Sequence, residues 1–298
     1  MMPTQQSWNQ RRGMQRDWRW RGWNIRYSYC PAATSEAMDN PPFLLIHGFG
    51  SSLTQWDQNI VPLSQYGAVY GLDLLGFGWS EKAAIAYDSG IWADQIYAFW
   101  QQFIRQPIIL VGHSLGALVS ATVAVDHPEM VQRLVLITVP TTRQDMISNP
   151  RLQSILGSIE RLFTSPLLVR LIFNVASQPR FIRSALRSIY IQRDRVTDDL
   201  VNHFVTPTLD RGAAQTLCRL TQSATQSTYS RSRQQLLHGL KQPTLILWGE
   251  KDMVVPLKGG ELDIQANPHI TLVMIPNAGH CVYDEAASKV NEAIAQWL

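Results

Sequence analysis

The stretch that decides the fold is residues 107–124, PIILVGHSLGALVSATVA. An apolar run leads into Gly112-His113-Ser114-Leu115-Gly116, and a segment without Gly or Pro follows it. This order predicts a strand, a sharp turn and a helix, which is the context in which a G-x-S-x-G motif displays a serine. Glycine at positions 112 and 116 leaves room where the strand and the helix meet. The sequence therefore predicts that Ser114 sits on a strained turn with its hydroxyl clear of the sheet.

Apolar runs typical of buried strands recur on both sides of this stretch, with helical patterns between them. These runs occupy residues 43–47, 69–72, 134–137, 243–248 and 270–275. The helical patterns predict a helix around Gln55–Gln65 and a closing helix from about Asp284 to Leu298. Strands that alternate with helices predict an α/β fold with a mostly parallel sheet, in which the carboxyl ends of the strands form the site.

An antiparallel hairpin is predicted ahead of these strands. Residues 18–29 alternate apolar and polar side chains on both sides of Gly22, which is the pattern of two short strands joined by a turn. Three tryptophans fall in this segment. We interpret them as packing at the sheet edge, with a membrane-surface or pigment contact as the alternative.

The alternation of strands and helices stops between residues 141 and 239. Helical runs of Leu, Ile and Phe, such as 152–156, 162–163, 167–173 and 181–187, alternate here with arginine. The segment holds thirteen arginines, no lysine and six acidic residues. It predicts a helical cap, or lid, inserted into an α/β core.

The predicted domain division follows from that insertion. The α/β core comprises residues 17–140 and 240–298, and the cap comprises residues 141–239. Residues 1–16 are polar and rich in Gln and Arg, so we expect a flexible N-terminal segment.

Composition excludes several classes of protein. The chain has 298 residues, 45% hydrophobic and 16% charged, which is typical of a globular protein. Its net charge of +3 comes without a lysine-rich run or a nucleic-acid-binding signature, so no nucleic-acid partner is predicted. Three widely spaced cysteines predict no disulfide framework. Without a secretory signal or a membrane-spanning stretch, we expect a cytoplasmic protein, soluble or attached to a membrane surface.

A serine hydroxyl needs an adjacent base that is itself held by a third group before it becomes a nucleophile at neutral pH. Asp252 follows the 243–248 strand, and His280 follows the 270–275 strand. The order Ser, Asp, His along the chain is typical of a catalytic triad on this kind of sheet. We therefore expect Ser114, Asp252 and His280 to be catalytic, although each residue alone also fits an ordinary turn or loop.

Other residues near these motifs have weaker assignments. The backbone N–H groups of Leu115 and Phe49 are predicted to form the oxyanion hole. Gly48 and His113 are predicted to support the nucleophile or line the substrate pocket.

The remaining candidates are alternatives or structural residues. Asp145 and Glu250 are the alternative acids. His47 is interpreted as a structural hydrogen-bonding residue, and Asp73 as a residue that holds its own turn. The other histidines have no partners at metal-ligand spacing, so neither a metal nor a cofactor is predicted.

These motifs together resemble the α/β-hydrolase superfamily from Trp18 to Leu298. The residues that carry the resemblance are His47-Gly48-Phe49-Gly50, Gly112–Gly116, Gly249-Glu250-Lys251-Asp252 and Gly279-His280. The related dehalogenases and epoxide hydrolases use aspartate as the nucleophile, and serine at position 114 separates this chain from them.

Within that superfamily the chain looks most like the chlorophyll dephytylase and pheophytinase group of photosynthetic organisms. The likeness rests on residues 18–23, 73–80 and 279–285. It implies hydrolysis of the phytyl ester of chlorophyll or pheophytin. The same resemblance implies peripheral attachment to the photosynthetic membrane. Pheophytinases tend to have Asn where this chain has His113, which favours a dephytylase-like member or a broader esterase.

The leading hypothesis is a serine esterase that cleaves a bulky hydrophobic ester through an acyl-enzyme. The alternatives are a general carboxylesterase or lipase-like enzyme, a carbon–carbon bond hydrolase or perhydrolase on the same triad, and a non-catalytic ligand receptor with the same fold. The arginines of the cap predict either attachment to an anionic membrane or an ordinary solvated surface.

Overall fold

The computed structural model describes residues 12–146, 166–257 and 261–298. Its centre is an eight-stranded sheet in the order β1-β2-β4-β3-β5-β6-β7-β8. The pairs from β4 to β8 are parallel, and β1 and β2 are antiparallel to their neighbours. The predicted α/β class is therefore confirmed. The strands are β1 (Met14–Trp20), β2 (Trp23–Cys30), β3 (Phe43–Ile46), β4 (Val69–Leu72), β5 (Ile108–His113), β6 (Val131–Ile137), β7 (Thr244–Gly249) and β8 (Ile270–Ile275).

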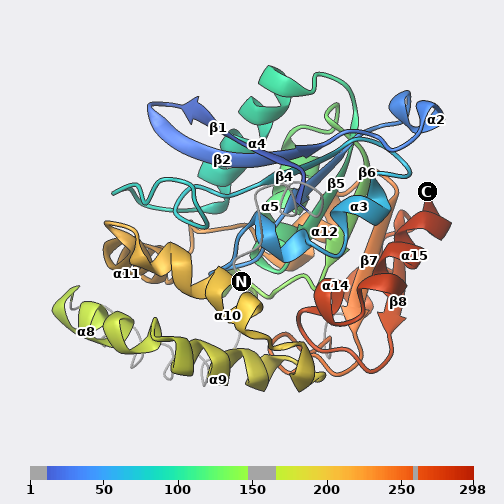
Figure 1. Cartoon of the computed structure of the whole chain (residues 1–298). Helices are drawn as coiled ribbons and strands as arrows, with labels where there is room; N and C mark the ends of the chain where they lie inside the picture. The colour runs from blue at the N-terminus through green and yellow to red at the C-terminus, as the bar shows by residue number, and fades with distance from the viewer. Residues whose placement is uncertain (1–11, 147–165, 258–260) are drawn as a thin grey trace.

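Helices pack on both faces of this sheet (Figure 1). The helices outside the β6–β7 connection are α2 (Ser35–Met38), η1 (Leu53–Trp56), α3 (Ile60–Leu63), α4 (Ser89–Phe103), α5 (Leu115–Asp126), α13 (Glu261–Gln265), α14 (Val282–Glu285) and α15 (Ala287–Trp297). The helices between β6 and β7 are α6 (Arg143–Met146), α8 (Pro166–Ala176), α9 (Pro179–Ile189), η2 (Arg193–Arg195), α10 (Asp198–Val205), η3 (Thr206–Leu209), α11 (Ala213–Ala224) and α12 (Arg233–Gly239).

The described part of the connection between β6 and β7 contains helices and no strand. Figure 1 shows α8 and α9 as the layer farthest from the sheet, with α10 and α11 between them and the core. The predicted runs 167–173 and 181–187 lie in α8 and α9. The runs 152–156 and 162–163 lie outside the described residues. The division into a core and a cap at 141 and 239 stays a prediction.

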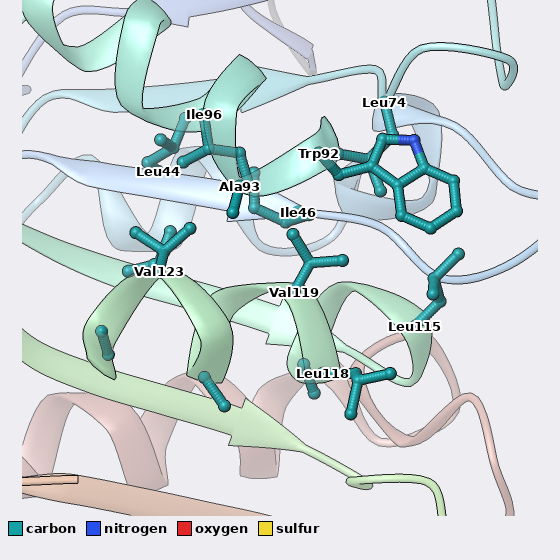
Figure 2. Close-up of a cluster of buried hydrophobic side chains, with 14 of the residues drawn as sticks. Leu44, Ile46, Leu74, Trp92, Ala93, Ile96, Leu115, Leu118, Val119 and Val123 are labelled. Atoms are coloured by element: carbon teal, nitrogen blue, oxygen red, sulfur yellow. The ribbon is translucent and has the colours of Figure 1, made fainter. Parts of the chain in front are cut away.

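The hydrophobic core has two layers because successive strand residues point to opposite faces. Leu44 and Ile46 of β3 belong to the layer under α4 and α5, where Figure 2 shows them close to Val119 and Ile96. Phe43 and Leu45 of the same strand belong to the other layer, which α3 and α15 cover. Each helix is thus held on the sheet by its apolar side chains.

The N-terminal hairpin extends further than its predicted boundary. β1 begins at Met14, three residues before residue 17, and pairs with β2 up to the Arg21-Gly22 turn. Trp18 packs edge-on against Phe99 and Phe103 of α4, with ring centroids 5.8 and 5.7 Å away. These contacts favour sheet-edge packing for this tryptophan. Residues 1–11 lie outside the described residues.

Two predicted helices are interrupted. The segment between 55 and 65 forms η1 and then a separate helix, α3. Proline is tolerated only in the first turn of a helix, so a new helix must begin shortly before Pro62. The predicted closing helix from Asp284 to Leu298 divides at Ala286, whose backbone is not helical (φ −125°, ψ 42°).

Candidate active site

Ser114 lies in the turn between β5 and α5 in a strained backbone conformation (φ 52°, ψ −115°). A Cβ atom added at Gly112 would lie within 3.0 Å of the Gly116 carbonyl oxygen, and one added at Gly116 would lie that close to the backbone of Ile46. Only glycine lets the strand and the helix approach so closely. The two glycines therefore hold Ser114 at the carboxyl end of the central strand.

Three predicted residues from three different strand ends come together here. The Nε2 atom of His280 lies 3.2 Å from Ser114 Oγ, and its Nδ1 atom lies 2.9 Å from Asp252 Oδ2. Because the carboxylate accepts a hydrogen bond from Nδ1–H, Nε2 is left as an acceptor for the serine hydroxyl. This arrangement has the geometry of a nucleophile, a base and an orienting acid.

Asp252 is held rigidly in this position. Its second oxygen, Oδ1, accepts hydrogen bonds from the backbone N–H groups of Val254 and Val255, at 2.9 and 2.8 Å. The alternative acids point elsewhere. Asp145 accepts hydrogen bonds from Thr142, and Glu250 accepts one from the backbone of Asn277.

His113 is buried directly behind the nucleophile. Its Nε2–H donates to the backbone carbonyl of His280 at 3.0 Å, and its ring packs against the rings of His280 and Tyr283. Burial lowers the pKa of His113, and the nearby His280 lowers it further, so the ring is neutral. This location favours a role in supporting His280 over contact with substrate.

Gly48 brings the loop after β3 against the same group. A Cβ atom at Gly48 would lie 2.8 Å from His113 Nδ1 and 3.3 Å from the Cβ of Ser114. The backbone of the next residue, Phe49, therefore begins close to Ser114. Leu115 is the first residue of α5, where a backbone N–H has no acceptor within the helix. Both predicted oxyanion donors thus belong to segments that adjoin Ser114.

His47 and Asp73 hold the loops around this site. His47 donates from Nδ1 to the Gly48 carbonyl and accepts from the Leu74 N–H at Nε2, while burial lowers its pKa to about 4. Asp73 accepts hydrogen bonds from the backbone of Leu53 at 2.6 Å and of Trp79 at 2.7 Å. Burial raises the pKa of Asp73 to about 7. Their contacts fit the predicted structural roles.

An apolar cavity of about 80 Å³ begins at the loop that carries Phe49. Its walls come from that loop, from the turn around Phe77, and from α8, α10 and α11. The aromatic and aliphatic lining residues include Phe49, Phe77, Phe173, Phe204, Leu217 and Leu220. The sequence did not identify the cap residues among these, because their spacing fits an ordinary helix core equally well.

A second, larger cavity of about 1120 Å³ shares Phe173, Thr208 and Ala213 with the first. It lies between α8 and α11, and its lining includes Arg170, Arg211 and Arg219. The two cavities therefore adjoin each other at α8, η3 and α11, and the larger one has arginines in its lining.

The described residues contain neither a candidate metal site nor a helix suited to crossing a membrane. No cluster of three or more His, Cys, Asp or Glu side chains in those residues has an arrangement that could hold a metal ion. Within the same ranges, no helix combines the length and apolar character needed to cross a membrane.

Comparison with known proteins points in one direction. An uncharacterized protein of Mycobacterium tuberculosis is 26% identical over 268 residues, which cover 88% of this chain and 76% of that protein. The (lyso)-N-acylphosphatidylethanolamine lipase of Mus musculus is 33% identical over 106 residues, covering 34% of this chain and 31% of the lipase. The alpha/beta hydrolase domain-containing protein VTE7 of Arabidopsis thaliana is 33% identical over 113 residues, or 37% of this chain and 34% of VTE7.

The fold is also similar to that of solved structures. The crystal structure of a membrane phospholipase A, described as a bacterial virulence factor, superposes with a TM-score of 0.74 at 24% identity. The superposition covers 98% of this chain and 89% of the phospholipase. The sequence profile of the alpha/beta hydrolase fold matches residues 41–287. The chain belongs to the alpha/beta hydrolase fold family.

Proposed function

We propose that this protein is a serine hydrolase that cleaves a hydrophobic carboxylic ester through an acyl-enzyme. The observation that carries the proposal is the pair of distances from His280 to Ser114 and to Asp252, 3.2 and 2.9 Å. In this reaction His280 takes the proton from Ser114 Oγ as the oxygen attacks the ester carbonyl, and then gives it to the departing alkoxide. A water molecule, activated by the same imidazole, releases the acid and regenerates the serine.

The negative charge that develops on the carbonyl oxygen needs preorganised donors. We assign this role to the backbone N–H groups of Leu115 and Phe49. Asp252 keeps the His280 ring in the required tautomer and stabilises the imidazolium that forms after proton transfer. The side chains of Leu115 and Phe49 take no part in the chemistry.

The apolar lining of the inner cavity supports a hydrophobic substrate. Phe173, Phe204 and Leu220 present carbon surface to it, and transfer of each CH₂ group from water to such a surface contributes about 0.8 kcal/mol. The inner volume of about 80 Å³ accommodates only part of a long chain. A longer substrate would extend into the cavity between α8 and α11.

The finer proposal is that the ester is the phytyl ester of chlorophyll or a related tetrapyrrole. It rests on the resemblance of residues 18–23, 73–80 and 279–285 to the dephytylase group, and on the partial similarity to VTE7. The apolar lining of the inner cavity suits part of a C20 isoprenoid chain. Chlorophyll is a membrane pigment, so this substrate would also place the protein at the photosynthetic membrane.

A lipase-like activity is the second candidate, because the (lyso)-N-acylphosphatidylethanolamine lipase shares 33% identity with part of the chain. Its substrate would be an acyl ester of a lipid. The two candidates differ in which side of the ester bond carries the long chain, and a comparison of substrates separates them.

The test uses purified wild type and Ser114→Ala. We expect wild type to hydrolyse p-nitrophenyl butyrate and Ser114 to react with a fluorophosphonate probe, and the variant to lose at least about 10⁴-fold in kcat. Chlorophyll a in detergent should yield chlorophyllide and phytol. Fast cleavage of lipid acyl esters without chlorophyllide would favour the lipase.

The remaining alternatives are also distinguished by this test. Equal inactivity of the two proteins on every ester, with no labelling of Ser114, would favour a ligand receptor. Cleavage of a carbon–carbon bond next to a ketone, without ester hydrolysis, would favour a carbon–carbon bond hydrolase.

A further inference from the structure

Two adjacent carboxylates in α14 connect the helical segment between β6 and β7 with the loop that carries His280. Asp284 and Glu285 follow His280 by four and five residues, and Glu285 is only 5% exposed. Their hydrogen-bond partners lie about ninety residues earlier in the chain, directly after α9. Figure 1 shows the end of α9 close to α14.

The side chain of Asp284 hydrogen-bonds to this distant segment. Its Oδ2 atom accepts a hydrogen bond from the Tyr190 hydroxyl at 2.7 Å. Arg195 donates to the backbone carbonyl of Asp284 at 2.8 Å and to its Oδ1 atom at 3.4 Å. All these contacts fasten the segment after α9 to α14, and none reaches the loop before His280.

Glu285 differs because its two oxygens serve different segments. Oε2 accepts hydrogen bonds from the backbone N–H groups of Ile191 and Gln192, at 2.8 and 3.0 Å. Oε1 accepts a hydrogen bond from the N–H of Gly279 at 3.1 Å. One buried carboxylate therefore holds the segment after α9 and the residue immediately before His280 at the same time.

The backbone of Gly279 also packs directly on that segment. A Cβ atom at this position would lie 2.7 Å from the carbonyl oxygen of Ile189 and 3.2 Å from the side chain of Ile191. No side chain fits between them. This close approach is independent of the hydrogen bonds and brings the same two segments together.

We propose that Glu285 is a positioning residue that joins residues 191–192 to Gly279, so that the helices over the cavity and the imidazole of His280 move as one unit. This role rests on the proposed function, since it concerns the same His280. It differs from the roles of Asp252 and His113, which hydrogen-bond to His280 directly.

The consequence for catalysis follows from the position of the joined segment. Residues 190–195 connect α9 to α10, and α10 contributes Phe204 to the inner cavity. A substrate that settles against Phe204 and stabilises α10 would therefore also stabilise the Gly279 backbone. We expect the alignment of His280 to depend on an intact connection, even for a substrate too small to touch α10.

The test compares Glu285→Gln with Asp284→Asn. A carboxamide has one oxygen, so in Glu285→Gln either Gly279 or the pair Ile191 and Gln192 faces an NH₂ group instead of an acceptor. We expect kcat for p-nitrophenyl acetate to fall about 10- to 100-fold, because a small misplacement of the base is costly. Asp284→Asn should leave this kcat within about twofold and raise KM only for long-chain esters.

Hydrogen exchange gives a readout that requires no catalysis. Glu285→Gln should speed amide exchange in residues 278–282 and in residues 189–195, whereas Asp284→Asn should speed it only in the second segment. The control Asp126→Asn removes the ion pair with Arg231, which lies away from His280, and should affect neither segment. Glu285→Asp keeps the charge and should recover part of the activity, and it carries the test if Glu285→Gln does not fold.

The outcomes that overturn the proposal are distinct from those that overturn the esterase function. Unchanged exchange in residues 278–282 of Glu285→Gln, or an unchanged kcat on the short ester, refutes the positioning role. A wild type that neither cleaves esters nor reacts with fluorophosphonate refutes the esterase function. In that case the exchange experiment still shows whether Glu285 joins Gly279 to residues 191–192.

Discussion

Asp73 is a fully buried carboxyl group whose protonation is coupled to folding. Burial raises its pKa from the usual 3.8 to about 7, although the N–H groups of Trp79 and Leu53 and the charge of Lys82 act in the opposite direction. Between these two pH values the folded chain keeps the proton and the unfolded chain releases it. The contribution of this group to stability is therefore fully present below pH 3.8 and is lost as the pH rises to about 7.

The first prediction compares wild type with Asp73→Asn, which does not titrate. We expect the free energy of unfolding of wild type, relative to the variant, to fall by up to about 4 kcal/mol between pH 4 and pH 7 and then to stay level. Urea denaturation at several pH values measures this difference. A gap between the two proteins that does not change from pH 4 to pH 8 would contradict the buried titration.

The second prediction concerns the acid that orients His280. Asp252→Asn should lower kcat for p-nitrophenyl butyrate by about 10³- to 10⁴-fold, because an amide stabilises the wrong tautomer of the imidazole. Glu250→Gln is the matched control, since the Glu250 side chain hydrogen-bonds to the Asn277 backbone and not to His280. Its kcat should stay within about twofold of wild type. Comparable losses in both variants would remove the assignment of Asp252.

At the scale of secondary-structure elements, the approach of β3, β5 and α5 determines where Ser114 stands. Gly116 lies so close to the backbone of Ile46 and His47 that a methyl group there forces the helix away from the strand. Because Ser114 is the residue before α5, any shift of this helix also moves the nucleophile.

The third prediction follows from this contact. Gly116→Ala should lower the free energy of unfolding by about 1–3 kcal/mol through overpacking, and lower kcat as well. Gly90→Ala is the control, because Gly90 lies exposed in α4 and its nearest non-adjacent atom is a side-chain oxygen of Asp88. That change should be neutral or stabilise by about 0.5–1 kcal/mol. Urea denaturation and ester hydrolysis of both variants measure these effects, and a fully stable, fully active Gly116→Ala would show that the contact does not constrain the turn.

Across the whole molecule, charge is unevenly distributed. Residues 141–239 carry thirteen arginines and six acidic residues, a surplus of seven positive charges, whereas the remaining thirteen basic and seventeen acidic residues leave a net charge of −4. The outer helix α8 also exposes apolar side chains, with Leu171 55% and Val175 49% exposed. This combination favours attachment of that side to an anionic membrane surface, because basic and apolar side chains both contribute to such binding.

The fourth prediction tests this attachment with lipid vesicles. Wild type should sediment with vesicles that contain anionic phosphatidylglycerol, less with neutral phosphatidylcholine vesicles, and less at high salt. Replacing Arg170 or Arg180 by Gln should weaken anionic binding about fivefold each, corresponding to about 1 kcal/mol per charge. Arg105→Gln is the control for the loss of one positive charge, because Arg105 is exposed and lies after α4, outside the segment between β6 and β7.

The apolar contribution has its own matched pair of variants. Leu171→Ser should weaken binding to anionic vesicles, whereas Leu262→Ser, in the exposed helix α13, should not. Equal binding of wild type to anionic and neutral vesicles, or equal effects of the two leucine variants, would favour an ordinary solvated surface.

Much of the fold could be predicted because its signals are local. The apolar runs of the parallel strands and the glycines around Ser114 are short sequence patterns. Strands β3 to β8 lie at these apolar runs. The single helix predicted between 55 and 65 was wrong in detail, because the segment forms two short helices, η1 and α3. Its apolar spacing is that of one helix, whereas Pro62 prevents a continuous one. The contacts of His280 could be inferred only in part, because the order of strand ends places Asp252 nearby but gives no distance.

The sequence by itself determined which side chains are available for chemistry and in which order they reach the edge of the sheet. Three-dimensional packing was needed to show which of the acids faces His280, that His113 packs against the ring of His280, and that Glu285 joins Gly279 to residues 191–192. The reason is physical. A strand or a tight turn depends on neighbours a few residues apart, whereas a hydrogen bond across ninety residues depends on how separate elements pack together.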